Sequence, residues 1–460
     1  MSLIKSISGI RGTIGGKVND NLTPLDIVKF ASAFGTWLQN NKNKKDLTLV
    51  IGRDARISGS MVSALVTATL QGLGIHVVDL GLSTTPTVEV MVPELNADGG
   101  IILTASHNPK QWNALKLLNE KGEFISGENG AEVLALAESE DFNYAEVDDL
   151  GQYETRDDAF DIHIRKILEL PMVDAEAIKA KKYKAVLDAV NSTGGIAIPM
   201  LLEKLGVEVV KLYCEPTGHF PHNPEPLKEH LTDICELVKK ENADLGIVVD
   251  PDVDRLALID ENGEMFGEEY TLVAVADYLL KHQKGAAVSN LSSSRALRDV
   301  ARAHGSEYFA SAVGEVNVVN LMKEKNAIIG GEGNGGIIYP DLHYGRDSLV
   351  GVALFLTHLA KANRSVSELR ATYPAYFMGK KKIELTPEID VDALLTKMEK
   401  MHQNEEISTV DGVKIDFENN WVHLRKSNTE PIIRIYTEAA SQEEADRLGD
   451  EMIAQIKSLI

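Results

Sequence analysis

The sequence predicts an α/β protein with mixed or mostly parallel sheets, followed by a smaller α+β domain at the C-terminus. Through the first three-quarters of the chain, short apolar segments alternate with amphipathic helical segments. In the last quarter the pattern changes to closely spaced alternating strands with two helices. The length of 460 residues also exceeds what one core supports, because single cores rarely grow beyond ~250 residues.

The strand candidates of the α/β part fall into three groups of comparable size, which predict three related α/β domains. The first group is Leu47–Gly52, Val77–Leu80 and Gly100–Thr104. The second group is Lys184–Asp188, Val207–Leu212 and Asp244–Val249. The third group is Leu256–Asp260, Ala286–Ser289 and Ala327–Gly330. Helical periods between these strands include Ser60–Gly72, Gly195–Leu205 and Arg295–Ala303.

The C-terminal segment predicts a fourth domain of α+β type. Its expected strands are Lys380–Leu385, Val413–Phe417, Val422–Leu424 and Ile432–Glu438. Its expected helices are Val391–His402 and Glu443–Ile460. An acidic, poorly apolar stretch at 138–149 marks the approach to the first boundary. We therefore expect domains over residues 1–152, 153–254, 255–374 and 375–460.

The composition of the chain restricts the kinds of partner that we expect it to bind and the compartment in which we expect it. The formal net charge of −22 disfavours sequence-independent binding to nucleic acid or to anionic membranes. Cys214 and Cys235 lack metal-ligand or Cys-x-x-Cys spacing, which is typical of free thiols in a reducing compartment, although a disulfide between them stays open. The N-terminus has no signal-peptide core, and no apolar run reaches ~18 residues, so we expect a cytoplasmic protein.

The segment 104–109 (TASHNP) directly follows a predicted buried strand. Asn-Pro ends regular structure and predicts a turn. The hydroxyl of Ser106 should therefore lie at the carboxyl end of a strand, where open α/β sheets place their chemistry. No Gly-x-Ser-x-Gly pattern surrounds it, which argues against acyl-transfer chemistry. Taken alone, the segment also fits an ordinary turn serine.

A second motif, residues 250–255 (DPDVDR), follows another predicted strand. Asp250, Asp252 and Asp254 would fall on one side of an extended backbone and could converge on one cation. Ligation by carboxylates alone suits Mg²⁺ or another hard ion. An EF-hand is excluded because Arg255 stands where that loop needs Gly and a strand follows. A solvated acidic turn is the alternative, but closely packed carboxylates repel one another unless a cation is bound.

The glycine-rich segment 330–336 (GGEGNGG) satisfies G-x-G-x-x-G after a predicted strand. A dinucleotide site needs a helix to begin there, whereas residues 337–340 continue as a strand, so we reject a NAD site. The pattern instead predicts a strand–loop–strand unit. Glu332 and Asn334 at its tip suit hydrogen bonds to vicinal hydroxyls, and a plain glycine-rich hairpin is the alternative.

Residues 425–431 (RKSNTEP), with Arg434 downstream, form a basic, hydroxyl-rich loop between two predicted strands. Arg425, two hydroxyls and an amide in one loop can cradle a phosphate. Such a loop is informative in so acidic a chain, with a solvated turn as the alternative. Arg11, Arg53 and Lys116 are further basic residues, and each alone would be an ordinary surface position.

In this order and at this spacing, the four motifs resemble those of the α-D-phosphohexomutase family over essentially the whole chain. The resemblance implies three related α/β domains and a smaller C-terminal α+β domain around a central cleft. It implies that Ser106 is a phosphoserine that donates and then recovers a phosphoryl group. It also implies that Asp250, Asp252 and Asp254 hold Mg²⁺ together with the Ser106 phosphate.

The same resemblance implies roles for the other motifs. Glu332 and Asn334 would contact sugar hydroxyls. The residues expected to bind the non-reacting phosphate are Arg425, Ser427, Asn428, Thr429 and Arg434. The catalytic candidates besides Ser106 are His107, Lys116, Arg11 and Arg53, and Arg255 is a further site residue.

Three positions depart from the family pattern. Gly336 stands where some members have a histidine proposed as acid/base, which moves that role towards Lys116. Ala114 replaces a common glycine, and Pro251 replaces a smaller residue. The chain resembles the archaeal-type phosphoglucosamine mutase branch of the family, which also includes phosphomannomutases. The segments that carry this resemblance are 313–316, 331–336 and 345–347.

The resemblance implies a Mg²⁺-dependent enzyme that interconverts hexose 6-phosphate and hexose 1-phosphate, with glucosamine phosphates preferred and a catalytic hexose 1,6-bisphosphate as activator. Phosphomannomutase/phosphoglucomutase activity is the alternative. A non-catalytic sugar-phosphate-binding protein is the alternative from another class, and an oxidoreductase ranks third. We expect a small phosphosugar as substrate, no nucleic-acid or membrane partner, and a monomer or homodimer.

Overall fold

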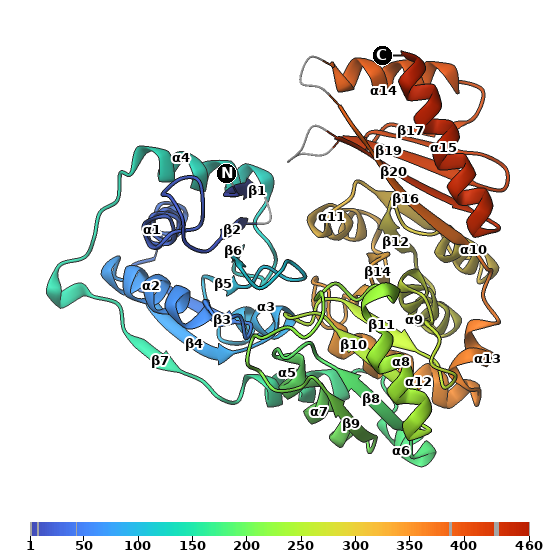
Figure 1. Cartoon of the computed structure of the whole chain (residues 1–460). Coiled ribbons are helices and arrows are strands. Elements are labelled where there is room, and N and C mark those ends of the chain that lie inside the picture. Colours follow the sequence, from blue (N-terminus) through green and yellow to red (C-terminus); the bar gives the residue numbers. More distant parts are fainter. Residues whose placement is uncertain (1, 7–8, 43, 386–388, 427–431, 460) are drawn as a thin grey trace. The chain divides into compact units, whose positions relative to one another are not determined.

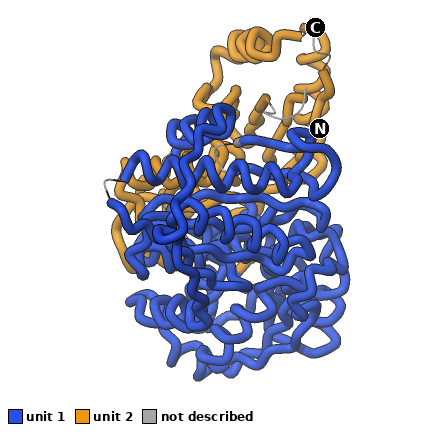
Figure 2. Tube along the Cα trace, turned by 90° about the vertical axis from the view of Figure 1, so that its left-hand side faces the viewer, with its two compact units in different colours: residues 1–275, 334–369 blue, residues 276–333, 370–460 orange. Residues whose placement is uncertain are grey.

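The computed structural model describes residues 2–6, 9–42, 44–385, 389–426 and 432–459 (Figure 1). The chain forms two compact units, one of residues 1–275 with 334–369 and one of residues 276–333 with 370–460 (Figure 2). The chain therefore leaves the first unit after Val275, returns to it at Asn334 and leaves it again after Leu369.

The first unit begins with a mixed sheet. Its strands are β1 (Ile4–Ser6), β2 (Gly9–Thr13), β3 (Thr48–Arg53), β4 (His76–Leu82), β5 (Gly99–Leu103), β6 (Trp112–Leu118) and β7 (Tyr153–Thr155). The accompanying helices are α1 (Pro24–Asn41), α2 (Gly59–Gly72), α3 (Thr85–Glu94) and α4 (Gly127–Ser139). The strand order is β1-β2-β6-β5-β3-β4-β7. β3 is parallel to β4 and β5, whereas β6 is antiparallel to β2 and β5.

Alternate residues of these strands supply a core on each face of the sheet. Leu49 and Ile51 join the core that contains the buried residues of α1, α2 and α4. Val50 and Ile102 join the opposite core, where Val88 of α3 packs. Because successive strand side chains point to opposite faces, a sheet covered on both sides needs continuous apolar runs. The segment Gly99–Leu103 is such a run, and it delivers the chain to Ser106.

The second sheet also lies in the first unit. Its strands are β8 (Lys184–Asp188), β9 (Glu208–Leu212), β10 (Leu245–Val249) and β11 (Leu256–Ile259). The helices of this region are α5 (Ala159–Leu168), α6 (Ala175–Lys181), α7 (Gly194–Lys204) and α8 (Thr232–Glu241). The order is β11-β10-β8-β9, with β8 parallel to β9 and β10.

One strand was grouped wrongly from the sequence. Leu256–Asp260 was expected to open the third group, but β11 pairs antiparallel with β10, with Val249 opposite Leu256. The turn 250–255 is short, and a short connection joins antiparallel neighbours, whereas a parallel crossover needs a dozen or more residues. The aspartate motif is therefore the turn of a hairpin.

After the second sheet, the chain continues with α9 (Glu268–His282). The second unit contains β12 (Ala287–Asn290), α10 (Ala296–Ala303), β13 (Tyr308–Ser311), α11 (Glu315–Lys325) and β14 (Ile329–Glu332). β12 is parallel to both β13 and β14. The chain then passes from β14 to β15 (Gly336–Ile338) through a turn, and α12 (Ser348–Ala362) and α13 (Val366–Arg370) follow. The predicted strand–loop–strand unit is confirmed, since β14 and β15 flank a turn and no helix begins within the described glycine-rich segment.

The C-terminal domain is an antiparallel sheet covered by helices. Its strands are β16 (Phe377–Glu384), β17 (Glu406–Ser408), β18 (Val413–Asp416), β19 (Trp421–Lys426) and β20 (Ile432–Ala439). Its helices are α14 (Val391–Met401) and α15 (Gln442–Leu459). The order β16-β20-β19-β18-β17 is antiparallel at every pairing. Both helices contribute to one core with the strands, so they cover the same face of the sheet (Figure 1).

The predicted α/β class with a C-terminal α+β domain is confirmed, whereas the predicted domain ranges stay predictions. The sequence did not indicate β6, whose Asn113 and Lys116 interrupt the apolar pattern. Cys214 and Cys235 are free thiols. Among the helices of the described residues, none has the length and apolarity needed to cross a bilayer.

Candidate active site

Ser106 lies in the turn that follows β5, as predicted. Its φ of +47° is left-handed, which is uncommon for a residue other than glycine and marks a constrained backbone. Its amide N–H donates to Thr104 Oγ1 at 2.9 Å. Its own Oγ donates to Asp250 Oδ2 at 2.7 Å, which brings together two motifs 144 residues apart in the sequence. Ser106 is therefore oriented by its own loop towards the aspartate motif.

Arg56 holds this serine loop (residues 104–109) in place. Its guanidinium donates to four backbone carbonyls, those of Ser106 (2.5 Å), Asn108 (2.7 Å), Pro109 (2.8 Å) and Trp112 (2.9 Å). Its Nε pairs with Asp54 Oδ2 at 3.0 Å, and both side chains are fully buried. We did not single out Arg56 from the sequence, although the Arg-Asp-Ala-Arg run that ends at it was a visible signal.

Asp250, Asp252 and Asp254, here called the aspartate cluster, converge as predicted, but their backbone is not extended. Residues 251–253 form a turn with Val253 at φ +65°. One carboxylate oxygen of each aspartate lies within 4.8 Å of the others. The turn is closed by Asp250 Oδ1, which accepts from the N–H groups of Asp254 and Arg255, both at 3.1 Å. A turn gathers three carboxylates more tightly than a strand of period two can.

Positively charged and hydroxyl groups surround the aspartate cluster. Lys116 Nζ lies 2.8 Å from Asp252 Oδ2 and 3.5 Å from Asp254 Oδ2. Arg346 Nη2 donates to Asp254 Oδ2 at 2.6 Å. Thr85 Oγ1 donates to Asp252 Oδ2 at 2.6 Å. Arg346 and Thr85 were not among the predicted site residues, although Arg346 lies in one of the segments that carried the resemblance.

Burial and neighbouring charges shift the pKa values of the groups in this site in different directions. Burial and the charge of Asp252 raise the pKa of Asp250 well above its usual range. Burial acts in the same direction on Asp252, but Lys116 outweighs it and lowers the pKa of that carboxyl. Burial would lower the pKa of Lys116, yet the carboxylates of Asp252 and Asp254 outweigh it and raise that pKa. Lys116 is therefore an ammonium at neutral pH.

The aspartate cluster fits a hard divalent cation. Asp252 Oδ1 and Asp254 Oδ1 are buried and have no hydrogen-bond partner among the described residues. A buried carboxylate oxygen without a partner is costly unless something supplies positive charge to it. Oxygen donors of this kind are those that Mg²⁺ prefers. The donor set, and not only the sequence spacing, therefore supports a metal site.

His107 and two arginines border Ser106 and the aspartate cluster. His107 Nδ1 lies 3.4 Å from Ser106 Oγ, and its Nε2 lies 3.5 Å from Arg255 Nη2. Burial and the charge of Arg255 lower the pKa of His107 well below its usual range, so it is a neutral imidazole. Arg255 also pairs with Glu225 at 3.0 Å. Burial and the charge of Arg255 likewise lower the pKa of Arg11, which lies in β2.

Gly336, which stands where some members of the family have a histidine, lies against Arg346. A Cβ atom at this position would come within 2.3 Å of Arg346 Cδ. Arg346 thus occupies the space that a side chain of residue 336 would need. Asn334 Oδ1 accepts from the N–H of Gly336 at 3.2 Å. Arg53 ends β3 and donates to the carbonyl of Asp54 at 3.3 Å, next to the serine loop.

The remaining predicted residues belong to the second unit. Glu332 is the last residue of β14, not the tip of the loop, and its Oε1 accepts from Asn290 Nδ2 (2.9 Å) and from the N–H of Gly314 (3.1 Å). Arg425 and Arg434 are directly opposite each other on β19 and β20. Arg425 Nε lies 2.7 Å from Asp411 Oδ2. Ser427, Asn428 and Thr429 lie outside the described residues.

A buried hydroxyl beside a carboxylate cluster that can hold a divalent cation suits transfer of a phosphoryl group better than acyl or hydride transfer. The matching family models identify this class of enzyme. They are those of phosphoglucomutase/phosphomannomutase α/β/α domain I over residues 4–144, domain II over 161–263, domain III over 267–376 and the C-terminal domain over 384–455. The chain belongs to the phosphoglucomutase/phosphomannomutase family, the α-D-phosphohexomutases, and is an intramolecular phosphotransferase.

Individual relatives agree with this assignment. The chain is 38% identical over 440 residues to a phosphoglucomutase/phosphomannomutase of Thermococcus kodakarensis, which covers 94% of this chain and 95% of the relative. It is 33% identical to a phosphoglucosamine/phosphogalactosamine mutase of Sulfurisphaera tokodaii, covering 98% of each. Its fold is similar to that of a phosphoglucomutase/phosphomannomutase family protein from Burkholderia thailandensis, with a TM-score of 0.85, 25% identity, and coverage of 99% and 98%.

Proposed function

We propose that this enzyme interconverts hexose 6-phosphate and hexose 1-phosphate, with glucosamine phosphates as preferred substrates, through phosphorylated Ser106 and a hexose 1,6-bisphosphate. The observation that carries this proposal is the hydrogen bond of 2.7 Å from Ser106 Oγ to Asp250 Oδ2, beside the unpartnered oxygens of Asp252 and Asp254. A phosphate on Ser106 would extend from this position into the same group of charges.

In the proposed cycle, the bond between phosphorus and Ser106 Oγ breaks as the free hydroxyl oxygen of the substrate bonds to phosphorus. The hydroxyl proton leaves to a base, and Oγ recovers a proton. The bisphosphate then turns over, and its other phosphoryl group returns to Oγ by the reverse exchange. Atoms and charges balance without a consumed co-reactant, so hexose 1,6-bisphosphate is needed only to load Ser106 at the start.

The surrounding residues would stabilise the transferring group. Mg²⁺ held by the aspartate cluster would supply positive charge to the phosphoryl oxygens. Lys116, Arg255 and Arg11 would add fixed positive charge on the protein side, which is the arrangement that stabilises developing charge in a buried site. His107, 3.4 Å from Ser106 Oγ, is placed to exchange a proton with that oxygen.

The C-terminal basic loop (residues 425–431) would hold the phosphate that does not react. Arg425 and Arg434 share a cross-strand position, so two guanidinium groups can approach one phosphate. Ser427, Asn428 and Thr429 would add weaker donors. The same loop would receive either end of the sugar, because the 1-phosphate and the 6-phosphate take turns as the non-reacting group. Glu332 and Asn334 would contact the sugar.

The preference for glucosamine rests on Glu332, which can pair with an ammonium as well as accept from hydroxyls. The similarity to a phosphoglucosamine/phosphogalactosamine mutase supports this preference. The similarity to a phosphoglucomutase/phosphomannomutase supports the second candidate, activity on mannose and glucose phosphates. A cytoplasmic location and a monomeric or dimeric state stay predictions.

Mass spectrometry of active enzyme tests the phosphoserine. Phosphate should be found on the peptide that contains Ser106, and Ser106→Ala should lose both this phosphate and mutase activity. Ser126→Ala, at an exposed helix N-cap, is the matched control and should keep both. A Ser106→Ala variant with full activity would exclude the mechanism. Wild-type protein that binds sugar phosphates but shows no turnover on any hexose phosphate would favour the alternative of a non-catalytic binding protein.

A substrate panel tests the preference. Purified enzyme, supplied with hexose 1,6-bisphosphate and Mg²⁺, is assayed side by side on glucosamine, mannose and glucose 1-phosphates. We expect the highest kcat/KM for glucosamine 1-phosphate, and we expect Glu332→Gln to reduce this advantage because the charged partner of the ammonium is lost. A clear preference for mannose 1-phosphate would replace this proposal with the phosphomannomutase/phosphoglucomutase alternative.

A further inference from the structure

A second group of metal-ligating side chains lies in the first unit, apart from the aspartate cluster. It consists of His163, His343 and Asp347, here called the histidine cluster. His163 comes from α5, His343 from the segment before α12, and Asp347 is the N-cap of α12. His163 and Asp347 are completely buried, and the side chain of His343 is only 7% exposed. The proposed reaction does not use this group, although Asp347 belongs to segment 345–347 of the resemblance.

The distances within the histidine cluster are close to those of a tetrahedral metal site. His163 Nε2 lies 2.9 Å and His343 Nε2 lies 3.3 Å from the same oxygen, Asp347 Oδ2. The three ligand atoms all lie within 4.8 Å of one another. Ligands bound to Zn²⁺ at ~2.0–2.2 Å are ~3.3–3.6 Å apart on a tetrahedron, so the two histidine–carboxylate distances lie within a few tenths of an ångström of this range.

Both histidines present Nε2 to the shared oxygen and have an oxygen beside Nδ1. Thr87 Oγ1 lies 2.9 Å from His163 Nδ1. Glu89 Oε2 lies 3.4 Å from His343 Nδ1. A metal-bound imidazole needs its other ring nitrogen protonated and facing such an oxygen, which fixes the tautomer that leaves Nε2 free to bind. Of the two rings, that of His163 has this outer hydrogen bond, whereas His343 Nδ1 makes no hydrogen bond among the described residues and has only the charge contact with Glu89.

Two buried carboxylates, those of Glu89 and Asp347, lie beside the two imidazoles. Asp347 Oδ1 accepts from the N–H groups of Leu349 (2.7 Å) and Val350 (3.3 Å), which leaves Oδ2 as the oxygen that faces both imidazoles. A Cβ at Gly345 would come within 1.9 Å of Glu89 Oε2, so a glycine is needed for this carboxylate to reach the cluster. A divalent cation would neutralise the two carboxylates while both imidazoles remain neutral.

We propose that His163, His343 and Asp347 bind a divalent transition-metal ion, with Zn²⁺ the best fit to two imidazoles and one carboxylate. The ion would have a structural role. It would tie α5 to the N-terminus of α12, with Thr87 and Glu89 of α3 as outer partners. Asp347 is adjacent to Arg346, which contacts Asp254, so the ion would also steady one cation of the reaction site.

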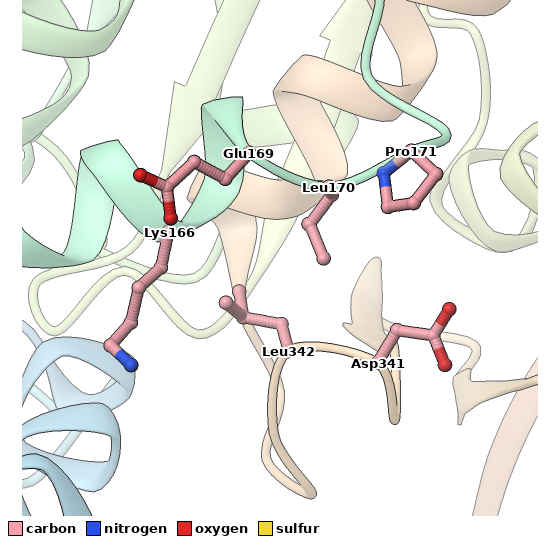
Figure 3. Close-up of a pocket in the computed structure, with 6 residues that line it drawn as sticks. All are labelled: Lys166, Glu169, Leu170, Pro171, Asp341 and Leu342. Atoms are coloured by element: carbon pink, nitrogen blue, oxygen red, sulfur yellow. The ribbon is translucent and has the colours of Figure 1, made fainter.

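The two segments that carry the histidines also border a surface pocket. Figure 3 shows Lys166 of α5, and Glu169 and Leu170 just after this helix, on one side of the pocket, with Asp341 and Leu342 on the other. Pro171 completes the lining. The pocket gives these segments a solvent-facing side, and His343 retains some exposure.

Metal analysis of the full-length enzyme tests this proposal. Protein stripped of metal is incubated with Zn²⁺ in a large excess of Mg²⁺, which occupies the aspartate cluster, and is then desalted for elemental analysis. We expect one zinc per chain, a melting temperature that rises with Zn²⁺ concentration, and loss of the zinc in His343→Gln and His163→Gln. His222→Gln is the matched control, because His222 pairs with Asp188 at 3.0 Å without a third ligand. This variant should bind zinc like the wild type.

Wild type that binds no zinc, or His343→Gln that retains it, would show that the histidine cluster is only a hydrogen-bonded network. Zinc that disappears on substitution of the aspartate cluster, and not of the histidines, would place the ion in the reaction site and overturn the proposal. If both histidine variants fail to fold, X-ray absorption of the zinc-loaded wild type decides. Two imidazole ligands support the site, and a shell of oxygens alone refutes it.

Discussion

Arg56→Lys tests whether the serine loop is held by one guanidinium. Arg56 donates to four backbone carbonyls of residues 106–112 and pairs with buried Asp54. A lysine ammonium can keep the pair with Asp54, but it lacks the planar fork that reaches the carbonyls. Hydrogen bonds to charged groups contribute ~1.5–3 kcal/mol each. If two of the four bonds to the carbonyls are lost and water partly replaces them, the free energy of unfolding should fall by about 3 kcal/mol.

A destabilisation of this size lowers the melting temperature by about 6–12 °C for a domain of ~150–250 residues. The effect on activity should be larger in kcat than in KM. Arg56 would not touch substrate, but it fixes the position of Ser106, and a displacement of about 1 Å can reduce the rate ~10²-fold. We therefore expect kcat to fall about 10²-fold, with KM changed less than about threefold.

Calorimetry and steady-state kinetics on the purified variant measure both effects. Arg156→Lys is the matched control, since Arg156 also pairs with an aspartate two residues away in the sequence, Asp158, at 2.9 and 2.7 Å, but at the surface. An exposed pair contributes only about 0–1 kcal/mol, so this variant should melt and turn over like the wild type. If Arg56→Lys kept wild-type kcat and melting temperature, the serine loop would not depend on Arg56.

Three further predictions concern the site. Asp→Asn at each position of the aspartate cluster should lower kcat ~10²–10³-fold, and EDTA should abolish turnover until Mg²⁺ is restored; unchanged turnover in all these tests would exclude the metal site. Arg425→Ala should raise KM for 1-phosphate and 6-phosphate substrates alike, and a defect in one direction alone would contradict a shared phosphate loop. Gly336→Ala should displace Arg346 from Asp254, because the new Cβ would lie 2.3 Å from Arg346 Cδ, and should lower kcat at least about tenfold. Gly72→Ala, at a helical glycine whose added Cβ would meet only Tyr144 Cδ1 at 3.6 Å, is the control for general damage, and equal losses in both variants would argue against a specific role of Arg346.

Local sequence patterns were sufficient where one principle decides the structure. The apolar run Gly99–Leu103 followed by Asn-Pro placed Ser106 at the end of a strand, because a sheet covered on both faces requires such a run. The alternating pattern of the last quarter predicted strands, because a sheet covered on one face needs apolar side chains at every second position only. Residues 337–340 excluded a dinucleotide site because a strand continues where a helix N-terminus is required.

The sequence alone determined the class of fold, the location of Ser106 and the residues of the carboxylate cluster, since each depends on neighbours close in the chain. Only the tertiary structure showed that β11 pairs with β10, that Arg56 carries the serine loop and that Arg346 fills the space beside Gly336. It also brought His163, His343 and Asp347 together, the first of them 184 residues before the last. The β10–β11 hairpin could have been inferred from its short turn, but the other arrangements depend on side chains that meet only after the sheets have packed, and spacing along the chain carries no signal for such contacts.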